Sequence, residues 1–132
     1  MFDLKEGISE TREMVVTGND TASRYGSGLI DVFATPAMIG LMEGTAQECV
    51  GKFLPEGFIT LGIEVNIKHL KATPVGMKVR SEAILKEVDG KKLLFEVNAW
   101  DETGQIGSGT HTRFIVETKI FLEKLKSSAH GK

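Results

Sequence analysis

Two ionisable side chains stand out in this sequence because each lies within an apolar pattern. Glu43 follows Leu41 and Met42 in a stretch with helical spacing, and His69 ends an alternating apolar row. Carboxylates and imidazoles are side chains that proteins use as general acids and bases. A carboxylate beside an apolar face needs a partner or a function, because burying an unpaired charge is costly. The elements that hold these two residues therefore determine what they can do.

Residues 32–53 have the pattern of a long buried helix. Thr35 is a good N-cap residue, and Pro36 suits the first helical position. At 100° per residue, Glu43 lies about 80° around the helix axis from Thr35 and about 12 Å along it. Three- and four-residue spacing predicts one wide apolar face, made of Met38, Leu41, Met42, Thr45, Ala46, Cys49, Val50 and Phe53.

After this helix the sequence alternates with a period of two residues, which is typical of a strand. One face of that strand is expected to carry Ile59, Leu61, Ile63, Val65 and Ile67. His69 continues the same parity, so its imidazole is expected to point toward the helix. Further strands are expected at residues 11–17, 77–88, 91–100 and 105–117, with a tight Asp89-Gly90 hairpin.

This order of elements predicts an α+β fold, in which one curved antiparallel sheet wraps around one long helix. The length of 132 residues fits a single domain, which we place at residues 1–126. Residues 18–31 are expected to form a loop before the helix. Residues 119–126 are expected to form a short amphipathic helix, followed by a polar tail at 127–132. A single sheet leaves edges and one flank of the helix uncovered, and dimerisation would cover them.

The composition argues against several classes of function. A formal net charge of −2 disfavours general nucleic-acid binding. No apolar run approaches the length of a membrane span, and the start of the chain lacks the pattern of a signal peptide, so a cytoplasmic location is expected. Cys49 is the single cysteine and is expected to be a small core residue rather than a metal ligand.

Three stretches carry a resemblance to a known family: VFATPAMIGLMEGTA, TLGIEVNIKHLKATPVGMKV and DETGQIGSGTHTRFIV. Together they resemble the signature stretches of the fluoroacetyl-CoA-thioesterase-like family of hotdog-fold proteins, from about residue 32 to residue 116. The resemblance implies that Thr35, Glu43 and His69 act together in thioester hydrolysis. It also implies a homodimer or a dimer of dimers with pockets at the subunit interface.

Hydrolysis of a thioester needs a nucleophile or an activated water, a proton carrier, and donors for the developing oxyanion. Glu43 could activate water or attack the carbonyl carbon itself. His69 could keep Glu43 ionised or pass a proton to the departing thiolate. Thr35 could hydrogen-bond either group, or act as nucleophile with His69 as its base. Backbone N–H groups at the helix N-terminus or around Gly62 are candidate oxyanion donors.

Each residue also has a purely structural interpretation when it is considered alone. Thr35 could simply cap the helix, Glu43 could be solvated, and His69 could be a structural histidine. Arg113 is a candidate substrate-binding residue or a member of a cross-strand ion pair. Lys68 and Lys71 flank His69 and could attract the phosphates of coenzyme A, or be ordinary solvated residues.

We therefore predict an acyl-CoA thioesterase that needs no metal or redox cofactor. Residues 24–30 contain only one aromatic side chain, Tyr25, in the loop that would close the acyl pocket in the family's namesake enzyme. This composition favours a general short- to medium-chain acyl-CoA over fluoroacetyl-CoA as the substrate. The alternative is a hotdog protein that binds or senses acyl-CoA without turnover. A hotdog hydratase is disfavoured, because the central region lacks a D-x-x-x-x-H arrangement.

Overall fold

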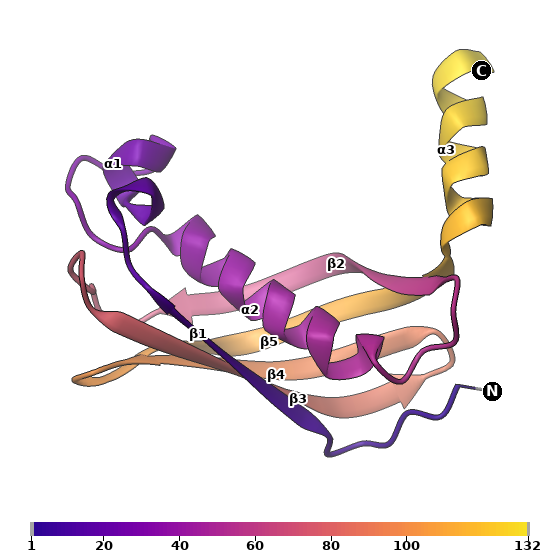
Figure 1. Ribbon diagram of the computed structural model, residues 1–132, viewed down its shortest axis with the longest axis horizontal. Helices are drawn as coiled ribbons and strands as arrows, with labels where there is room; N and C mark the ends of the chain where they lie inside the picture. Colours follow the sequence, from indigo (N-terminus) through magenta and orange to yellow (C-terminus); the bar gives the residue numbers. More distant parts are fainter. Residues whose placement is uncertain (1, 132) are drawn as a thin grey trace.

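The computed structural model describes residues 2–131. Its elements follow the expected order of one short strand, one long helix and four longer strands (Figure 1). In chain order they are β1 (Ser9–Val15), the 3-10 helix η1 (Gly18–Asp20), α1 (Ala22–Tyr25), α2 (Thr35–Gly51), β2 (Phe58–His69), β3 (Lys78–Asp89), β4 (Lys92–Asp101), β5 (Gly104–Glu117) and α3 (Thr118–Gly131).

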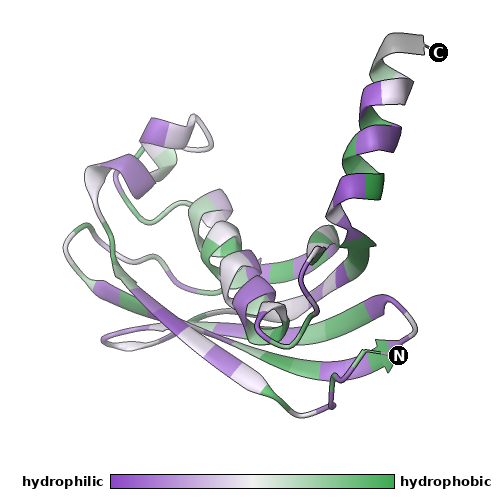
Figure 2. Cartoon of the chain, turned by 45° about the vertical axis from the view of Figure 1, so that its right-hand side comes forward, coloured by the Kyte–Doolittle hydropathy of each residue, from purple (hydrophilic) through white to green (hydrophobic). Residues whose placement is uncertain are grey.

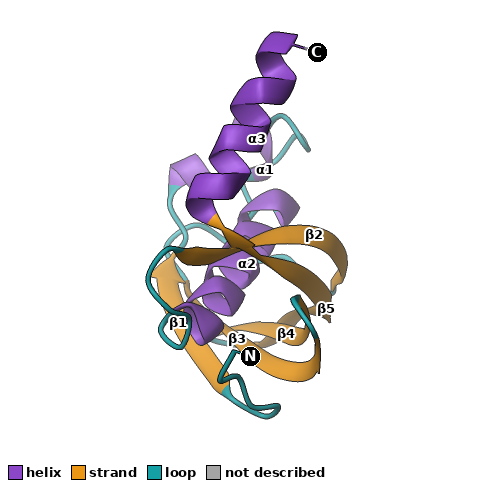
Figure 3. Ribbon diagram, turned by 90° about the vertical axis from the view of Figure 1, so that its right-hand side faces the viewer, coloured by secondary structure: helices purple, strands orange, loops and turns teal. Residues whose placement is uncertain are grey.

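The five strands form one sheet in the order β1-β3-β4-β5-β2, and every neighbouring pair is antiparallel. The sheet curves around α2, so the helix lies in the hollow of the sheet (Figures 1 and 3). This arrangement confirms the predicted α+β fold with one helix wrapped by one sheet. β1 and β2 form the two edges of the sheet.

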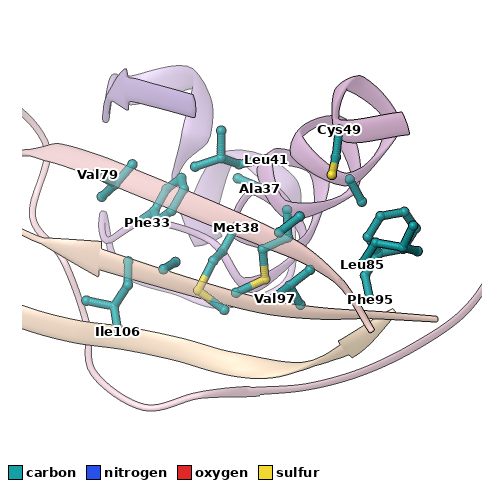
Figure 4. Packing of buried hydrophobic residues seen from close by; sticks show 14 of the residues in the cluster. Phe33, Ala37, Met38, Leu41, Cys49, Val79, Leu85, Phe95, Val97 and Ile106 are labelled. Atoms are coloured by element: carbon teal, nitrogen blue, oxygen red, sulfur yellow. The ribbon is translucent and has the colours of Figure 1, made fainter. Parts of the chain in front are cut away.

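The core lies between one face of α2 and the concave face of the sheet, where Met38, Val97 and Ile106 are buried (Figure 4). A Cβ atom on Gly107 would lie 2.6 Å from the Met38 sulfur, so Met38 would have to shift if this position on β5 carried a side chain. Alternate positions on β4 are all buried: Leu93, Phe95, Val97 and Ala99. Burial of each large side chain contributes about 1.5–3 kcal/mol. Phe53 falls outside this core because α2 ends at Gly51.

The expectation for β2 was wrong in one respect, because the strand does not present one continuous face. Its register against β5 shifts between Gly62 and Glu64. Such a bulge inserts an extra residue and changes which side chains point inward. Thr60 is therefore buried, whereas Ile59 and Ile63 are exposed.

The segment before α2 is more ordered than expected. β1 ends at Val15, and the side chain of Thr17 caps η1 in a reciprocal capping box with Asp20. Thr21 then caps the four-residue helix α1. A strand that continued through Thr17 would need a neighbouring strand to accept its backbone N–H groups. The side-chain caps accept backbone N–H groups here without such a neighbour.

The C-terminal helix α3 continues through residues expected to form the polar tail and stands away from the sheet, beyond the β2 edge (Figures 1 and 3). Figure 2 shows hydrophobic and hydrophilic segments mixed along it. Its exposed apolar residues are Ile120, Phe121, Leu122 and Leu125. Within residues 2–131, no helix has the length and hydropathy to cross a membrane.

Candidate active site

Thr35 is the first residue of α2, but it does not cap the helix. The N-cap is Ala34, which has no side chain able to accept a backbone N–H. The Thr35 hydroxyl instead lies 2.8 Å from Nδ1 of His69. The helix start thus depends on Pro36 and tertiary contacts, and the threonine side chain is available for chemistry. This contact corrects the expectation that Thr35 is the N-cap.

His69 is the last residue of β2, and its ring points toward the start of α2 as the strand parity predicted. Its Nε2 atom is buried and, among the described residues, has no hydrogen-bond partner. Burial lowers the pKa of His69, so the ring is neutral at physiological pH and able to accept a proton. Thr35 and His69 line a cavity of about 410 Å³ together with residues of α1, of the segment before α2 and of the chain after β2.

Glu43 is partly buried on α2, and it lies beside a second group of polar residues. A Cβ atom on Gly62 would be 3.2 Å from Glu43 Oε2, 3.0 Å from the His111 ring and 3.4 Å from Arg113 Nη1. Gly62 therefore lets the carboxylate, the imidazole and the guanidinium converge at the β2 bulge. A side chain at this position would crowd all three groups.

Arg113 is buried on β5, and within residues 2–131 it does not form the cross-strand ion pair considered from the sequence. Its Nε donates to Thr60 Oγ1 at 2.7 Å, and Nη2 donates to the Thr60 carbonyl at 2.9 Å. Nη1 lies 3.0 Å from His111 Nε2. Burial lowers the pKa of Arg113, and the nearby Glu43 carboxylate opposes that shift.

The structure thus places the expected residues in two groups rather than one. Thr35 and His69 are in contact at one end of β2, whereas Glu43, Gly62 and Arg113 meet at the bulge. In residues 2–131 no hydrogen bond joins Glu43 to Thr35 or His69. Thr60 and His111, which lie in the TLG and GTHTR stretches, also belong to the second group, although they were not predicted as site residues.

The two lysines beside His69 differ in their surroundings. Lys71 Nζ lies 3.2 Å from Asp101 Oδ1 and also contacts Thr103 Oγ1, so its charge is shared with a buried carboxylate. Lys68 is exposed, and no ion pair involving it is found in the described part of the chain. Residues 2–131 contain no cluster of three His, Cys, Asp or Glu side chains placed to hold a metal ion.

The single curved antiparallel sheet around one central helix is the architecture of hotdog-fold proteins. A hot-dog-like protein from Thermanaerovibrio acidaminovorans superposes with a TM-score of 0.89 at 22% identity, over 98% of this chain and 96% of that one. At that identity the likeness establishes the fold alone.

The chain belongs to the fluoroacetyl-CoA-specific thioesterase family, whose model it matches over residues 16–119. It is 38% identical to the fluoroacetyl-CoA thioesterase of Streptantibioticus cattleyicolor over 96 residues, covering 73% of this chain and 69% of that protein. A solved fluoroacetyl-CoA thioesterase structure has a TM-score of 0.88 at 32% identity, covering 94% of this chain and 96% of that one. The chain is therefore a thioester hydrolase.

Proposed function

We propose that this protein acts in the cytoplasm and hydrolyses short- to medium-chain acyl-CoA to a free acid and coenzyme A, using Thr35, Glu43 and His69. The observation that carries the proposal is the 2.8 Å contact between Thr35 Oγ1 and His69 Nδ1. A hydroxyl held against a neutral imidazole is the arrangement of an activated nucleophile and its base.

In the first step, Thr35 Oγ1 attacks the thioester carbonyl while His69 Nδ1 takes the hydroxyl proton. The C–S bond breaks, and the same proton passes from His69 to the departing sulfur of coenzyme A. Because α2 has no side-chain cap, the backbone N–H groups of Thr35 and Ala37 are candidates to stabilise the developing oxyanion. Pro36 has no N–H, and the Met38 N–H donates to the Ala34 carbonyl.

In the second step, a water molecule attacks the acyl-threonine and gives a proton to Glu43. The bond between the acyl carbon and Thr35 Oγ1 breaks, and the proton taken up by Glu43 passes to the threonine oxygen, which returns both groups to their starting states. A competing route has Glu43 attack the thioester directly, with Thr35 and His69 only positioning the substrate. The two routes differ in whether the Thr35 hydroxyl is indispensable.

The distance between the two groups of residues supports a site shared by two protomers. Gly62, which adjoins Glu43, and His69 are seven residues apart on the same edge strand β2. Antiparallel pairing of two β2 edges about their midpoint would bring Gly62 of one chain opposite His69 of the partner subunit. Exposed Ile63 and Val65 on this edge would then be covered.

Substrate recognition is proposed to come from the loop before α2 and from surface charge. Leu29 is 97% exposed and Tyr25 is also exposed, so the loop could close over an acyl chain with aliphatic and aromatic surface. Lys68 is the better placed of the two lysines for a coenzyme A phosphate, because Lys71 is already paired with Asp101. Arg113 acts at the other end of the site, beside Glu43.

The testing experiment measures release of free thiol from acetyl- to decanoyl-CoA, phenylacetyl-CoA and fluoroacetyl-CoA, by the wild-type protein and by Glu43→Gln in parallel. Turnover that peaks at short or medium chains and falls by at least about 10² in the variant is expected. Binding without turnover of any of these substrates would contradict the proposal and favour an acyl-CoA binding protein. A preference confined to fluoroacetyl-CoA would contradict the proposed substrate range.

A further inference from the structure

His111 is a buried imidazole whose two nitrogens are both engaged. Only 1% of the residue is exposed. Its Nδ1 lies 2.8 Å from the backbone carbonyl of Glu64, and its Nε2 lies 3.0 Å from Nη1 of Arg113. A carbonyl oxygen can only accept and a guanidinium can only donate, so Nδ1 must carry the proton and Nε2 must accept. These two contacts together select one neutral tautomer.

The bulge in β2 creates this arrangement. The register shift between Gly62 and Glu64 occurs where the strand passes His111, and the Glu64 carbonyl is the atom that meets Nδ1. Gly62 leaves room for the ring, since a Cβ there would be 3.0 Å from His111 Cε1. The irregularity of this strand therefore has an identifiable role in orienting one side chain.

All three guanidinium nitrogens of Arg113 donate hydrogen bonds to Thr60 or His111. Thr60 accepts from Nε and Nη2, and His111 accepts from Nη1. A guanidinium fixed in this way cannot swing away from Glu43 without breaking bonds in a buried setting. Protonation of His111 would set an N–H against the guanidinium and disrupt the arrangement.

We infer that His111 is a positioning residue, which as its neutral Nδ1–H tautomer fixes the Arg113 guanidinium beside Glu43 and so holds that carboxylate in place during hydrolysis. This inference rests on the proposed function of Glu43. The charged groups that face the imidazole are Arg113 on its own strand and Glu43 on α2. On β4 its neighbour is the uncharged Phe95, with ring centroids 6.4 Å apart.

Two substitutions distinguish the role of Nδ1 of His111 from the role of Nε2. His111→Gln can retain an acceptor near the Nε2 position for Arg113, whereas His111→Asn can retain only the donor near Nδ1. We expect His111→Gln to keep kcat within about threefold of wild type and His111→Asn to lower kcat by about 10- to 100-fold. KM should stay within about threefold of wild type in both variants, because the displaced groups act on the chemical step rather than on substrate binding. Equal effects of the two variants on kcat, or a rise in KM in place of the fall in kcat in His111→Asn, would overturn the inference.

The wild-type protein provides a test that does not depend on a variant folding. Nitrogen-15 NMR of the His111 ring at pH 7 should show a protonated Nδ1 and an unprotonated Nε2. A doubly protonated ring or the opposite tautomer would contradict the inference. Glu43→Gln run beside these measurements distinguishes the two proposals: if it turns over normally, the proposed function fails, whereas His111 is judged by its own variants and spectrum.

Discussion

Thr35 Oγ1 lies 2.8 Å from His69 Nδ1, and this contact joins the first residue of the central helix to the last residue of the strand that follows it. The helix could have used the same hydroxyl as a cap, which is typically worth about 1 kcal/mol. The hydroxyl faces the imidazole instead, and this choice motivates the first prediction.

Replacement of Thr35 should separate the nucleophilic route from the positioning route. Thr35→Ser keeps a hydroxyl within reach of His69 and is expected to retain kcat within about tenfold, whereas Thr35→Ala should lose at least about 10². Steady-state thiol release measures both variants. Comparable activity in Ser and Ala variants would show that the hydroxyl is not the nucleophile.

The pH dependence of stability should reflect two histidines, the partly buried His69 and the fully buried His111. Burial lowers the pKa values of both His69 and His111, so the folded state binds fewer protons than the unfolded state below about pH 6.5. The contribution of the two neutral rings to the free energy of unfolding is therefore complete above that pH, and it is lost as the pH falls toward their folded-state pKa values. Urea midpoints measured from pH 7.5 to pH 5 should therefore decrease, and they should decrease less in His69→Asn. A midpoint that stays constant over this range would contradict the assignment of neutral buried rings.

Gly62 is expected to be sensitive to a single added methyl group. Gly62→Ala places a carbon within 3.2 Å of Glu43 Oε2 and 3.0 Å of the His111 ring, so these groups must move by a few tenths of an ångström. We expect kcat to fall by about 10- to 100-fold. Gly40→Ala is the matched control, because nothing lies within 4 Å of its added carbon and the helix should gain stability. Equal activity of the two variants would argue against a crowded site at Gly62.

A composite site can be tested by mixing two inactive proteins. Thr35→Ala and Glu43→Gln are each expected to be inactive as homodimers, yet a heterodimer would hold one site with no substituted residue. Refolding an equal mixture should restore about a quarter of wild-type activity if the site is shared. Sedimentation at micromolar concentration should show a dimer or larger assembly. A mixture that stays as inactive as its components, or a stable monomer, would contradict the shared site.

Asp101 anchors the segment that follows His69, and it should contribute to stability. Its carboxylate is 1% exposed and accepts from Thr73 Oγ1 and Thr103 N, each at 2.8 Å, and from Lys71. Burial alone would raise the pKa of Asp101, but these hydrogen bonds hold it well below its usual range. Asp101→Asn should lower the free energy of unfolding by about 1–3 kcal/mol at pH 7.

The stabilising effect of the Asp101 carboxylate should depend on pH. A carboxyl with a lowered folded-state pKa stabilises the protein above its unfolded value of about 3.9 and loses that effect as the pH falls. The difference in free energy of unfolding between wild type and Asp101→Asn should therefore become smaller below pH 4. Glu102→Gln is an exposed neighbour and should have little effect. If this difference in free energy of unfolding stays the same below pH 4, the ionised form of Asp101 is not what stabilises the wild-type protein.

Much of the fold could be predicted because burial follows a simple period on each element. Leu93, Phe95 and Val97 alternate inward on β4, and Met38 and Met42 recur on one face of α2, as the sequence indicated. The β2 bulge could not be predicted in this way, because the alternation from Ile59 to Ile67 continues unbroken through it. Gly62 was the one local signal, since glycine within a strand often marks a bulge.

The site could be predicted only in part, for a related reason. A threonine before a proline is equally consistent with a helix cap and with a functional hydroxyl, and only the position of His69 in space distinguishes them. Thr60 and His111 were missed because their role depends on the guanidinium of Arg113 between them. The two-residue spacing of His111 and Arg113 is compatible with one strand face, but it does not reveal that Arg113 Nη1 and His111 Nε2 are in contact.

The buried cysteine has a practical consequence for assays that detect the thiol of released coenzyme A. Cys49 is fully buried on α2, its sulfur lies 3.6 Å from the Ile8 carbonyl, and burial raises the pKa of its thiol to about 11. Because a thiolate is the reactive form, the folded chain should not react with aromatic disulfide reagents. Colour developed from such a reagent then reports released coenzyme A alone. In denaturant the same reagent should titrate one sulfhydryl per chain, which makes Cys49 a built-in probe of opening.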